Sequence, residues 1–139
     1  MRQYIVHKQI KITAPADAVW DALTNPEKTK HYFFGCRVFS DWKPGSDIAF
    51  KGRMFWVIPF KMQGKIIAIQ PPRLLQYNLF NKDGSQSQVT DRLEESDSIT
   101  TLRVTDDVGS GVGAEKRYTR SQKGWGKILT GLKQFVEHA

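Results

Sequence analysis

A chain of 139 residues is long enough for one domain that buries about two-thirds of the surface of its unfolded chain. Hydrophobic residues make up 40% of it and charged residues 25%, a globular composition that argues against a disordered chain. The net charge of +7 raises the question of nucleic-acid binding. The basic residues are spread out, however, and no cluster interleaves arginine with aromatic residues. A solvated basic surface is therefore expected, with no specific nucleic-acid partner.

Cysteine usage and hydropathy point to the cytoplasm. The single cysteine, Cys36, allows no intramolecular disulfide, as is usual in a reducing compartment. The first residues alternate between polar and apolar and contain no apolar core of a signal peptide. No apolar run approaches the roughly 18 residues that a membrane-spanning helix needs. A cytoplasmic location without a transmembrane segment is the expectation.

The chain opens with one strand and two short helices. Gln3–Thr13 alternates as a strand does, with imperfect phase. Pro15 suits a first helical turn, because its missing N–H has no partner there, and four apolar residues then share one helical face: Ala16, Val19, Trp20 and Leu23. Asn25 followed by Pro26 is a second start signal, which predicts a short helix to about His31.

From residue 33 to residue 106 the pattern predicts short antiparallel strands. Turn residues gather at three places: Lys43–Ser46, Asn81–Gly84 and Glu95–Ser98. The segments between them are expected to form strands joined by short connections: Ile48–Lys51, Met54–Ile58, Met62–Ile69, Leu74–Phe80, Gln88–Leu93 and Thr100–Thr105. Pro71-Pro72 should end one strand, since proline cannot donate to a sheet.

A long amphipathic helix is predicted from about Ala114 to Glu137. Its apolar face should carry Tyr118, Trp125, Ile128, Leu129, Leu132, Phe135 and Val136. Its opposite face is basic, with Lys116, Arg120, Lys123 and Lys127. Three glycines interrupt it, and at least one of them is expected to permit a close approach or to leave room for a ligand: Gly124, Gly126 and Gly131.

Only this helix, about 35 Å long, can cover the apolar face of such a sheet. The predicted class is α+β: a curved antiparallel sheet of about six or seven strands around a long C-terminal helix, with two short helices after the first strand. Repeats and linkers are absent from the sequence, so residues 1–139 are predicted to form a single domain.

Five segments resemble those of one family, in the same order along the chain: Ile12–Lys28, Gly64–Tyr77, Val89–Glu95, Thr100–Asp107 and Gly124–Glu137. The chain is thereby similar to the Hsp90-ATPase-activator-homologue (AHSA1-like) family of the START / Bet v 1-like (SRPBCC) superfamily. This resemblance implies the helix-grip fold and either a small apolar ligand or a partner protein. Through the chaperone in the family name it also implies a role in the stress response.

Signals for catalysis or metal binding are weak. Cys36 has no sequence signature of a neighbouring base, and the histidines show no metal-ligand spacing: His7, His31 and His138. Adjacent carboxylates such as Asp106 and Asp107 should point to opposite faces of a strand and are expected to be solvated at turns. The glycine pattern Gly109–Ala114 resembles a dinucleotide fingerprint, but no second parallel strand can follow it. No catalytic residue, metal or cofactor is therefore expected.

The many aromatic residues are the most informative feature for function. A sheet curved around one helix leaves space lined by large rings, which is how apolar ligand pockets are built. The leading interpretation is a non-catalytic binding domain for a small hydrophobic molecule, with a cavity lined by Trp20, Phe34, Trp56, Phe60, Tyr77, Trp125 and Leu129. One alternative is a protein-interaction module that uses the apolar run Phe55–Phe60. Another is a cofactor-free enzyme of the cyclase or hydratase type, which needs polar side chains that converge inside the cavity.

Overall fold

The computed structural model describes residues 4–54 and 58–139. In chain order, the elements are β1 (Ile5–Ile12), α1 (Ala16–Thr24), α2 (Pro26–Thr29), β2 (Arg37–Ser40), β3 (Asp47–Met54), β4 (Ile58–Gln70), β5 (Leu74–Phe80), β6 (Gln86–Ser96), β7 (Ile99–Asp107) and α3 (Ala114–Glu137). The order of strands and helices, with two short helices after the first strand, confirms the predicted fold class.

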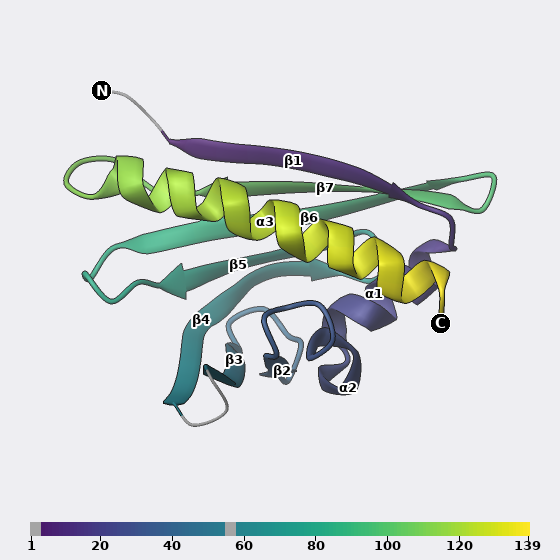
Figure 1. Ribbon diagram of the computed structural model, residues 1–139, viewed down its shortest axis with the longest axis horizontal. Coiled ribbons are helices and arrows are strands. Elements are labelled where there is room, and N and C mark those ends of the chain that lie inside the picture. Colours follow the sequence, from purple (N-terminus) through teal and green to yellow (C-terminus); the bar gives the residue numbers. More distant parts are fainter. Residues whose placement is uncertain (1–3, 55–57) are drawn as a thin grey trace.

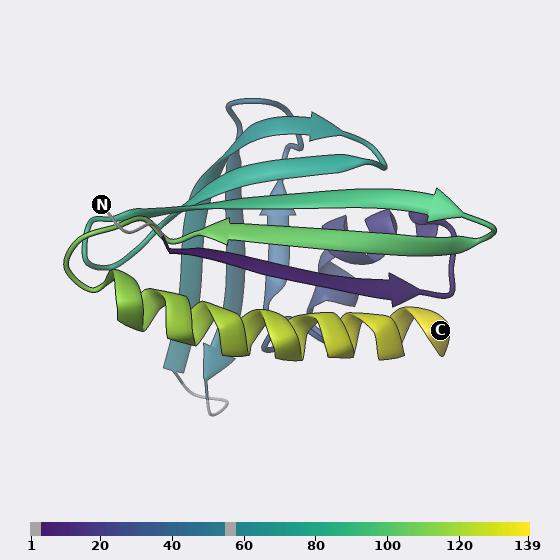
Figure 2. The same ribbon diagram turned by 90° about the horizontal axis from the view of Figure 1, so that it is seen from above.

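The seven strands form one antiparallel sheet in the order β1-β7-β6-β5-β4-β3-β2. Consecutive strands from β2 to β7 are neighbours, and the chain's first strand joins the sheet beside its last. The sheet is strongly curved, so that β2, β3 and part of β4 run across the direction of β1 and β7 (Figure 2). The concave side of this curve faces α3 (Figure 1).

The long helix α3 lies on the concave side with its apolar face inward. Trp125, Ile128, Leu129 and Leu132 are buried, while the basic residues Lys116, Arg120, Lys123 and Lys127 are exposed. Both faces agree with the helical period read from the sequence. The helix thereby fills the space that the curved sheet leaves open.

The N-terminal end of α3 is held by a buried arginine. Gly109, Gly111 and Gly113 adopt positive φ angles that favour glycine. Arg117, 8% exposed, donates from Nε to the carbonyl oxygen of Val108 at 2.9 Å. Its Nη1 donates to Asp83 Oδ2 at 2.8 Å and to the carbonyl of Val112 at 3.2 Å. The glycine pattern therefore forms the connection between the sheet and the helix, and Arg117 holds this connection in place by hydrogen bonds to its backbone.

The short helices α1 and α2 and the segment after them cover one end of the sheet. The Asn25 side chain caps α2 by accepting from the Glu27 N–H at 3.0 Å, as its sequence position predicts. The α2–β2 loop (residues 30–36) then turns toward α3. Tyr32 donates from its hydroxyl to the carbonyl oxygen of Ala22 at 2.6 Å, which fastens this loop to α1.

Three strand assignments differ from the sequence-based ones. The predicted strand Met54–Ile58 is wrong, because Met54 ends β3 and pairs with Ile58, which begins β4. The short edge strand β2 was not predicted, because its four residues are too few to show a period. The strand β4 begins at Ile58 and continues through Pro59, where the sequence suggested a break. Pro59 lies where β4 pairs with β3 alone, since pairing with β5 begins at Gly64. A proline is tolerated at such an edge, because no neighbour needs its missing N–H. Part of the predicted segment Met54–Ile58 lies outside the described residues.

Candidate functional site

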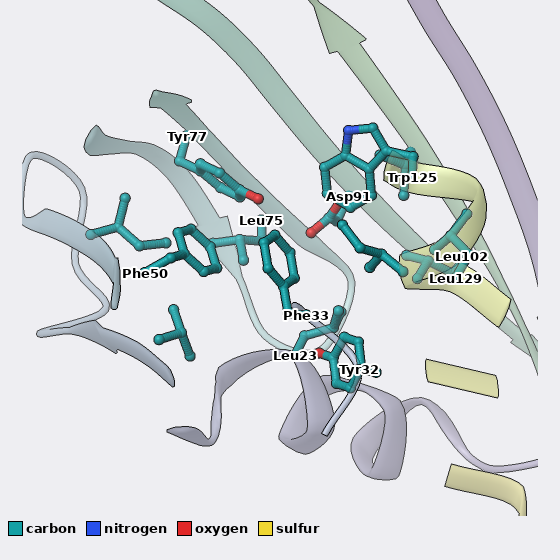
Figure 3. Close-up of a pocket in the computed structure, with 14 residues that line it drawn as sticks. Leu23, Tyr32, Phe33, Phe50, Leu75, Tyr77, Asp91, Leu102, Trp125 and Leu129 are labelled. Atoms are coloured by element: carbon teal, nitrogen blue, oxygen red, sulfur yellow. The ribbon is translucent and has the colours of Figure 1, made fainter. Parts of the chain in front are cut away.

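A small cavity lies between the inner face of the sheet, α3 and the α2–β2 loop (Figure 3). Its volume is about 20 Å³, and one water molecule needs about 10–15 Å³ measured in this way. The lining comes from every layer of the fold and is almost wholly apolar: Leu23, Tyr32, Phe33, Val38, Ile48, Phe50, Leu75, Tyr77, Asp91, Leu102, Val104, Trp125, Ile128 and Leu129. In this conformation the cavity accommodates a water molecule and nothing larger.

Five aromatic residues line the cavity: Tyr32, Phe33, Phe50, Tyr77 and Trp125. Phe33 makes most of the contacts among their rings. The Phe33 ring stacks on Phe50 at 4.7 Å between centroids and meets Trp125 edge to face at 6.0 Å. Phe50 in turn lies 5.9 Å from the ring of Tyr77. The Phe33 ring, which comes from the loop, therefore separates the aromatic residues of the sheet from those of the helix.

The backbone of the α2–β2 loop sends two adjacent phenylalanines in opposite directions. Phe34 has a φ of 52° and Gly35 a φ of 74°, so the chain reverses directly after Phe33. Phe33 is 7% exposed and Phe34 is 55% exposed. Phe34 lies outside, where its ring is 3.9 Å from the place that a Cβ on Gly124 would take.

Asp91 is the one acidic residue in this lining. It sits on the inner face of β6 between the buried Val89 and Leu93 and is 3% exposed. Its side chain makes no hydrogen bond with any described residue, and its Oδ1 is fully enclosed. Burial, and secondarily the nearby Asp106 carboxyl, raises the pKa of Asp91 to about 7, because a low-dielectric interior disfavours the charged form.

The Tyr77 hydroxyl is directed toward the Asp91 carboxylate (Figure 3). Tyr77 on β5 is opposite Val89, so Asp91, two residues further along β6, lies diagonally from it on the same face. No hydrogen bond joins the Tyr77 hydroxyl to another described residue. Burial first, and then Asp91, raises the pKa of Tyr77 well above its ordinary value. Tyr77 therefore remains a neutral hydroxyl that can donate.

Asp106 is a second buried carboxylate, on β7, and it has partners. Its Oδ2 accepts from Ser121 Oγ at 2.5 Å and from Trp125 Nε1 at 3.0 Å. Burial raises the pKa of Asp106, while these two hydrogen bonds act in the opposite direction. The expectation that Asp106 is solvated at a turn is wrong, because it is 7% exposed and faces inward. Its role here is to orient the Trp125 ring.

The structure separates the seven candidate site residues into four groups. Tyr77, Trp125 and Leu129 line the cavity. Trp20 and Phe60 are partly buried and pack against the core, but they do not line the cavity. Phe34 points outward beside Phe33. Trp56 lies outside the described residues, as does the first half of the apolar run Phe55–Phe60, while Ile58, Pro59 and Phe60 belong to β4.

Sequence reasoning missed Phe33, Phe50 and Asp91. The signal for Asp91 was present in the alternation of Val89, Asp91 and Leu93, since every second residue of a strand shares a face. A carboxylate between two apolar residues of a buried face is the kind of exception that points to a site.

Other candidate chemistry can be placed as well. The Cys36 thiol is buried, and burial raises its pKa, which disfavours the nucleophilic thiolate. His31 stacks on Phe135 at 5.1 Å. Within residues 4–54 and 58–139, no three His, Cys, Asp or Glu side chains gather as a metal site requires. No described helix is both long and apolar enough to cross a membrane.

Comparison with known proteins agrees with this architecture. ChR145 from Cytophaga hutchinsonii is 33% identical, with a TM-score of 0.77, and the match covers 99% of this chain and 97% of that one. CalU16 from Micromonospora echinospora is 25% identical, with a TM-score of 0.79 and coverage of 96% and 76%. The Aha1 dimer from Colwellia psychrerythraea is 17% identical, with a TM-score of 0.76 and 96% of both chains covered, which shows the shared fold alone.

No curated protein sequence matches this chain significantly. The family model of the Activator of Hsp90 ATPase homolog 1-like proteins, however, matches residues 13–137. That match extends over nearly the whole chain and confirms the resemblance found in the sequence. The chain therefore belongs to the Activator of Hsp90 ATPase homolog 1-like family.

Proposed function

We propose that this chain is a non-catalytic binding domain for one small hydrophobic molecule. The molecule occupies the space between the inner face of the sheet, α3 and the α2–β2 loop. The family and fold support a ligand-binding or a cyclase-type domain. The proposal is carried by one observation, the position of the Phe33 ring. This ring comes from a loop and lies between Phe50 of the sheet and Trp125 of the helix.

The size of the cavity requires Phe33 to move when a ligand enters. Pockets for organic ligands measure about 300–1,000 Å³, whereas this cavity is about 20 Å³. An aromatic ligand in place of the Phe33 ring would recover its contacts with Phe50 and Trp125. The part of this loop suited to opening is the turn at Phe34 and Gly35, which is exposed and has positive φ angles, while the bond from Tyr32 to Ala22 holds the start of the loop. A free, buried Cys36 is compatible with the cytoplasmic location that this proposal includes.

The test is a titration of the wild-type protein with toluene, followed by heteronuclear NMR. Binding should shift the Trp125 indole N–H and the amides of the α2–β2 loop. Phe33→Ala, or the milder Phe33→Leu, should bind toluene more tightly because no ring has to leave. The matched control is Phe80→Ala, which removes an exposed ring from β5 and should leave the affinity unchanged. Binding to the variants but not to the wild type would show that Phe33 is a fixed core residue, and the proposal would fail.

A cofactor-free enzyme is a second candidate, favoured by one specific observation. Asp91 and Tyr77 converge on the cavity, and a carboxyl group with a pKa of about 7 suits general acid–base chemistry at neutral pH. The Asp91 carboxylate would take a proton from the carbon beside a ketone while the Tyr77 hydroxyl hydrogen-bonds the ketone oxygen. Hydrogen–deuterium exchange at the methyl group of acetophenone in D₂O, faster than in buffer and lost in Asp91→Asn, would favour this candidate.

A partner protein is the remaining alternative, and the family description favours it. Its test is the ATPase rate of purified Hsp90 with and without this protein. A stimulated rate, together with no response of Trp125 to toluene, would replace the ligand-binding proposal by a protein-interaction module.

A further inference from the structure

We propose that Asp91 and Tyr77 form the polar recognition pair of the cavity and that they select a ligand carrying a hydroxyl group on an otherwise apolar body. The proposal rests on the proposed function, because it specifies the chemistry of the molecule bound there. It is carried by the burial of both side chains, by their shared direction and by the absence of hydrogen-bond partners for them among the described residues.

The first step is the position of Asp91 in the core. A carboxylate without a hydrogen-bond partner is among the least favourable groups to bury, and most buried polar groups in proteins have a partner. Asp91 is 3% exposed and has none among the described residues. An apolar residue at this position would extend the run of Val89 and Leu93 without that penalty. A carboxylate here is consistent with a partner that is not part of the chain.

The second step is that the other donors near Asp91 are already used. The Tyr32 hydroxyl, which lines the same cavity, donates to the carbonyl oxygen of Ala22. Opposite Asp91 on β7 lies Val104, and the neighbouring inward residue there is Leu102. The donors near Asp106, from Ser121 and Trp125, are directed to Asp106 itself. The buried arginine of the described chain, Arg117, is bound at the other end of the fold near Asp83. Asp91 therefore faces the cavity and the Tyr77 hydroxyl.

The third step is the complementarity of the two side chains. The Asp91 carboxylate accepts hydrogen bonds, and the Tyr77 hydroxyl can donate one. A ligand hydroxyl satisfies both, because its O–H donates to Asp91 and its oxygen accepts from Tyr77. A ketone could only accept, an ammonium group could only donate, and an anionic carboxylate would be repelled by Asp91. The remaining lining, which includes Phe50, Leu75, Leu102 and Leu129, is complementary to an apolar body.

The test compares phenol with toluene, which have nearly the same shape and differ in the hydroxyl group. Both are titrated against the wild-type protein, with the Trp125 indole N–H resonance as the readout. Phenol should bind at least about tenfold more tightly than toluene, because a hydrogen bond to a charged group lowers a dissociation constant by about that factor. Asp91→Leu should abolish this preference, and Tyr77→Phe should reduce it several-fold. The matched control Tyr118→Phe, at the other end of α3 beside Tyr4, should retain the preference.

The outcomes separate the two proposals. Equal binding of phenol and toluene, or an advantage of phenol that survives in Asp91→Leu, overturns the recognition pair and leaves the binding cavity intact. Failure of both compounds to shift Trp125 in the wild-type protein overturns the proposed function and the recognition pair with it. A preference for phenol that disappears in Asp91→Leu, while toluene binding persists, establishes the pair.

Discussion

Two buried carboxylates on neighbouring strands of one sheet face differ in what surrounds them. Asp106 on β7 accepts hydrogen bonds from Ser121 and Trp125. Asp91 on β6 lies diagonally from it. The Tyr77 hydroxyl points toward Asp91, but no hydrogen bond reaches the Asp91 side chain from a described residue. The fold thus forms two hydrogen bonds to Asp106, both through Oδ2, and none to Asp91, although the buried Oδ1 of each acid has no partner among the described residues. The difference makes Asp106 a support for the helix and, under the proposed function, makes Asp91 the acid that is available to a ligand.

The largest expected effect is the dependence of stability on pH at Asp91. Because the folded-state pKa is raised from 3.8 to about 7, the folded chain keeps a proton that the unfolded chain has released. Stability from this group is fully present below about pH 4 and is lost as the pH rises through about 7. The full difference is on the order of 4 kcal/mol. Asp91→Leu should therefore be more stable than the wild type at pH 8 and gain little at pH 4.

Urea unfolding at a series of pH values measures this effect. The comparison uses Asp91→Asn as a second variant, since an amide of similar shape removes the titration but keeps a polar group. Both variants should flatten the curve between about pH 4 and 7. Curves parallel to that of the wild type would mean that the pKa of Asp91 is the same in the folded and the unfolded protein.

The second effect is the contrast between the same substitution at the two acids. Asp106→Leu removes the acceptor of two donors, Ser121 Oγ and Trp125 Nε1. Leaving a buried donor unpaired costs about 1–3 kcal/mol, so Asp106→Leu should lower the free energy of unfolding at neutral pH while Asp91→Leu raises it. If both substitutions changed the free energy of unfolding in the same direction, the distinction between the two acids would be wrong.

A smaller effect is expected from Ser121. Ser121→Ala removes one of the two hydrogen bonds to Asp106 and should cost about 1 kcal/mol. The pKa of Asp106 should then rise further, because the hydrogen bond from Ser121 is the largest of the influences that lower it. A carbon-detected NMR titration of the Asp106 carboxyl measures this. Thr119→Ala, on the exposed face of the same helix, is the control and should leave that titration in place.

The smallest effect concerns the position of α3, on which the Trp125–Asp106 bond depends. A Cβ on Gly131 would be 3.0 Å from the Tyr32 Cβ, whereas a Cβ on Gly126 would meet nothing within 4 Å. Gly126→Ala should therefore stabilise the helix by up to about 1 kcal/mol. Gly131→Ala should show less of that gain or a loss, because the loop has to move. Equal gains in thermal unfolding would show that Gly131 has no packing role.

Long periodic segments were predictable from the sequence, and side-chain directions in loops were not. The helix Ala114–Glu137 and the strand Leu74–Phe80 have the predicted bounds, because many residues repeat one period there. The same period placed Trp125 and Leu129 on the inner face. Strand alternation likewise contains the information that Asp91 faces inward, although the prediction did not use it.

Phe34 was predicted to line the cavity, but Phe33 does so. This difference shows what a local sequence pattern cannot predict. Both are adjacent aromatic residues in a segment without periodicity, and their composition favours neither direction. A left-handed φ of 52° at Phe34 decides which ring enters the core. The Phe34 ring lies 3.9 Å from the place that a Cβ on Gly124 of α3 would take, so the surroundings of this turn include a helix that is far away in the sequence.

The place of β1 at the edge of the sheet has a consequence for folding. Ile5 pairs with Asp107 and Ile12 with Thr100, and the backbone N–H of Thr13 donates to Glu137 Oε2. The first strand therefore reaches its partners only after β7 and α3 have been synthesised. Contacts between such distant residues slow folding, to milliseconds or seconds in domains rich in them. On the ribosome, Ile5–Ile12 has no strand to pair with until β7 has been made, and an unpaired, partly apolar strand is open to aggregation or to protection by a chaperone.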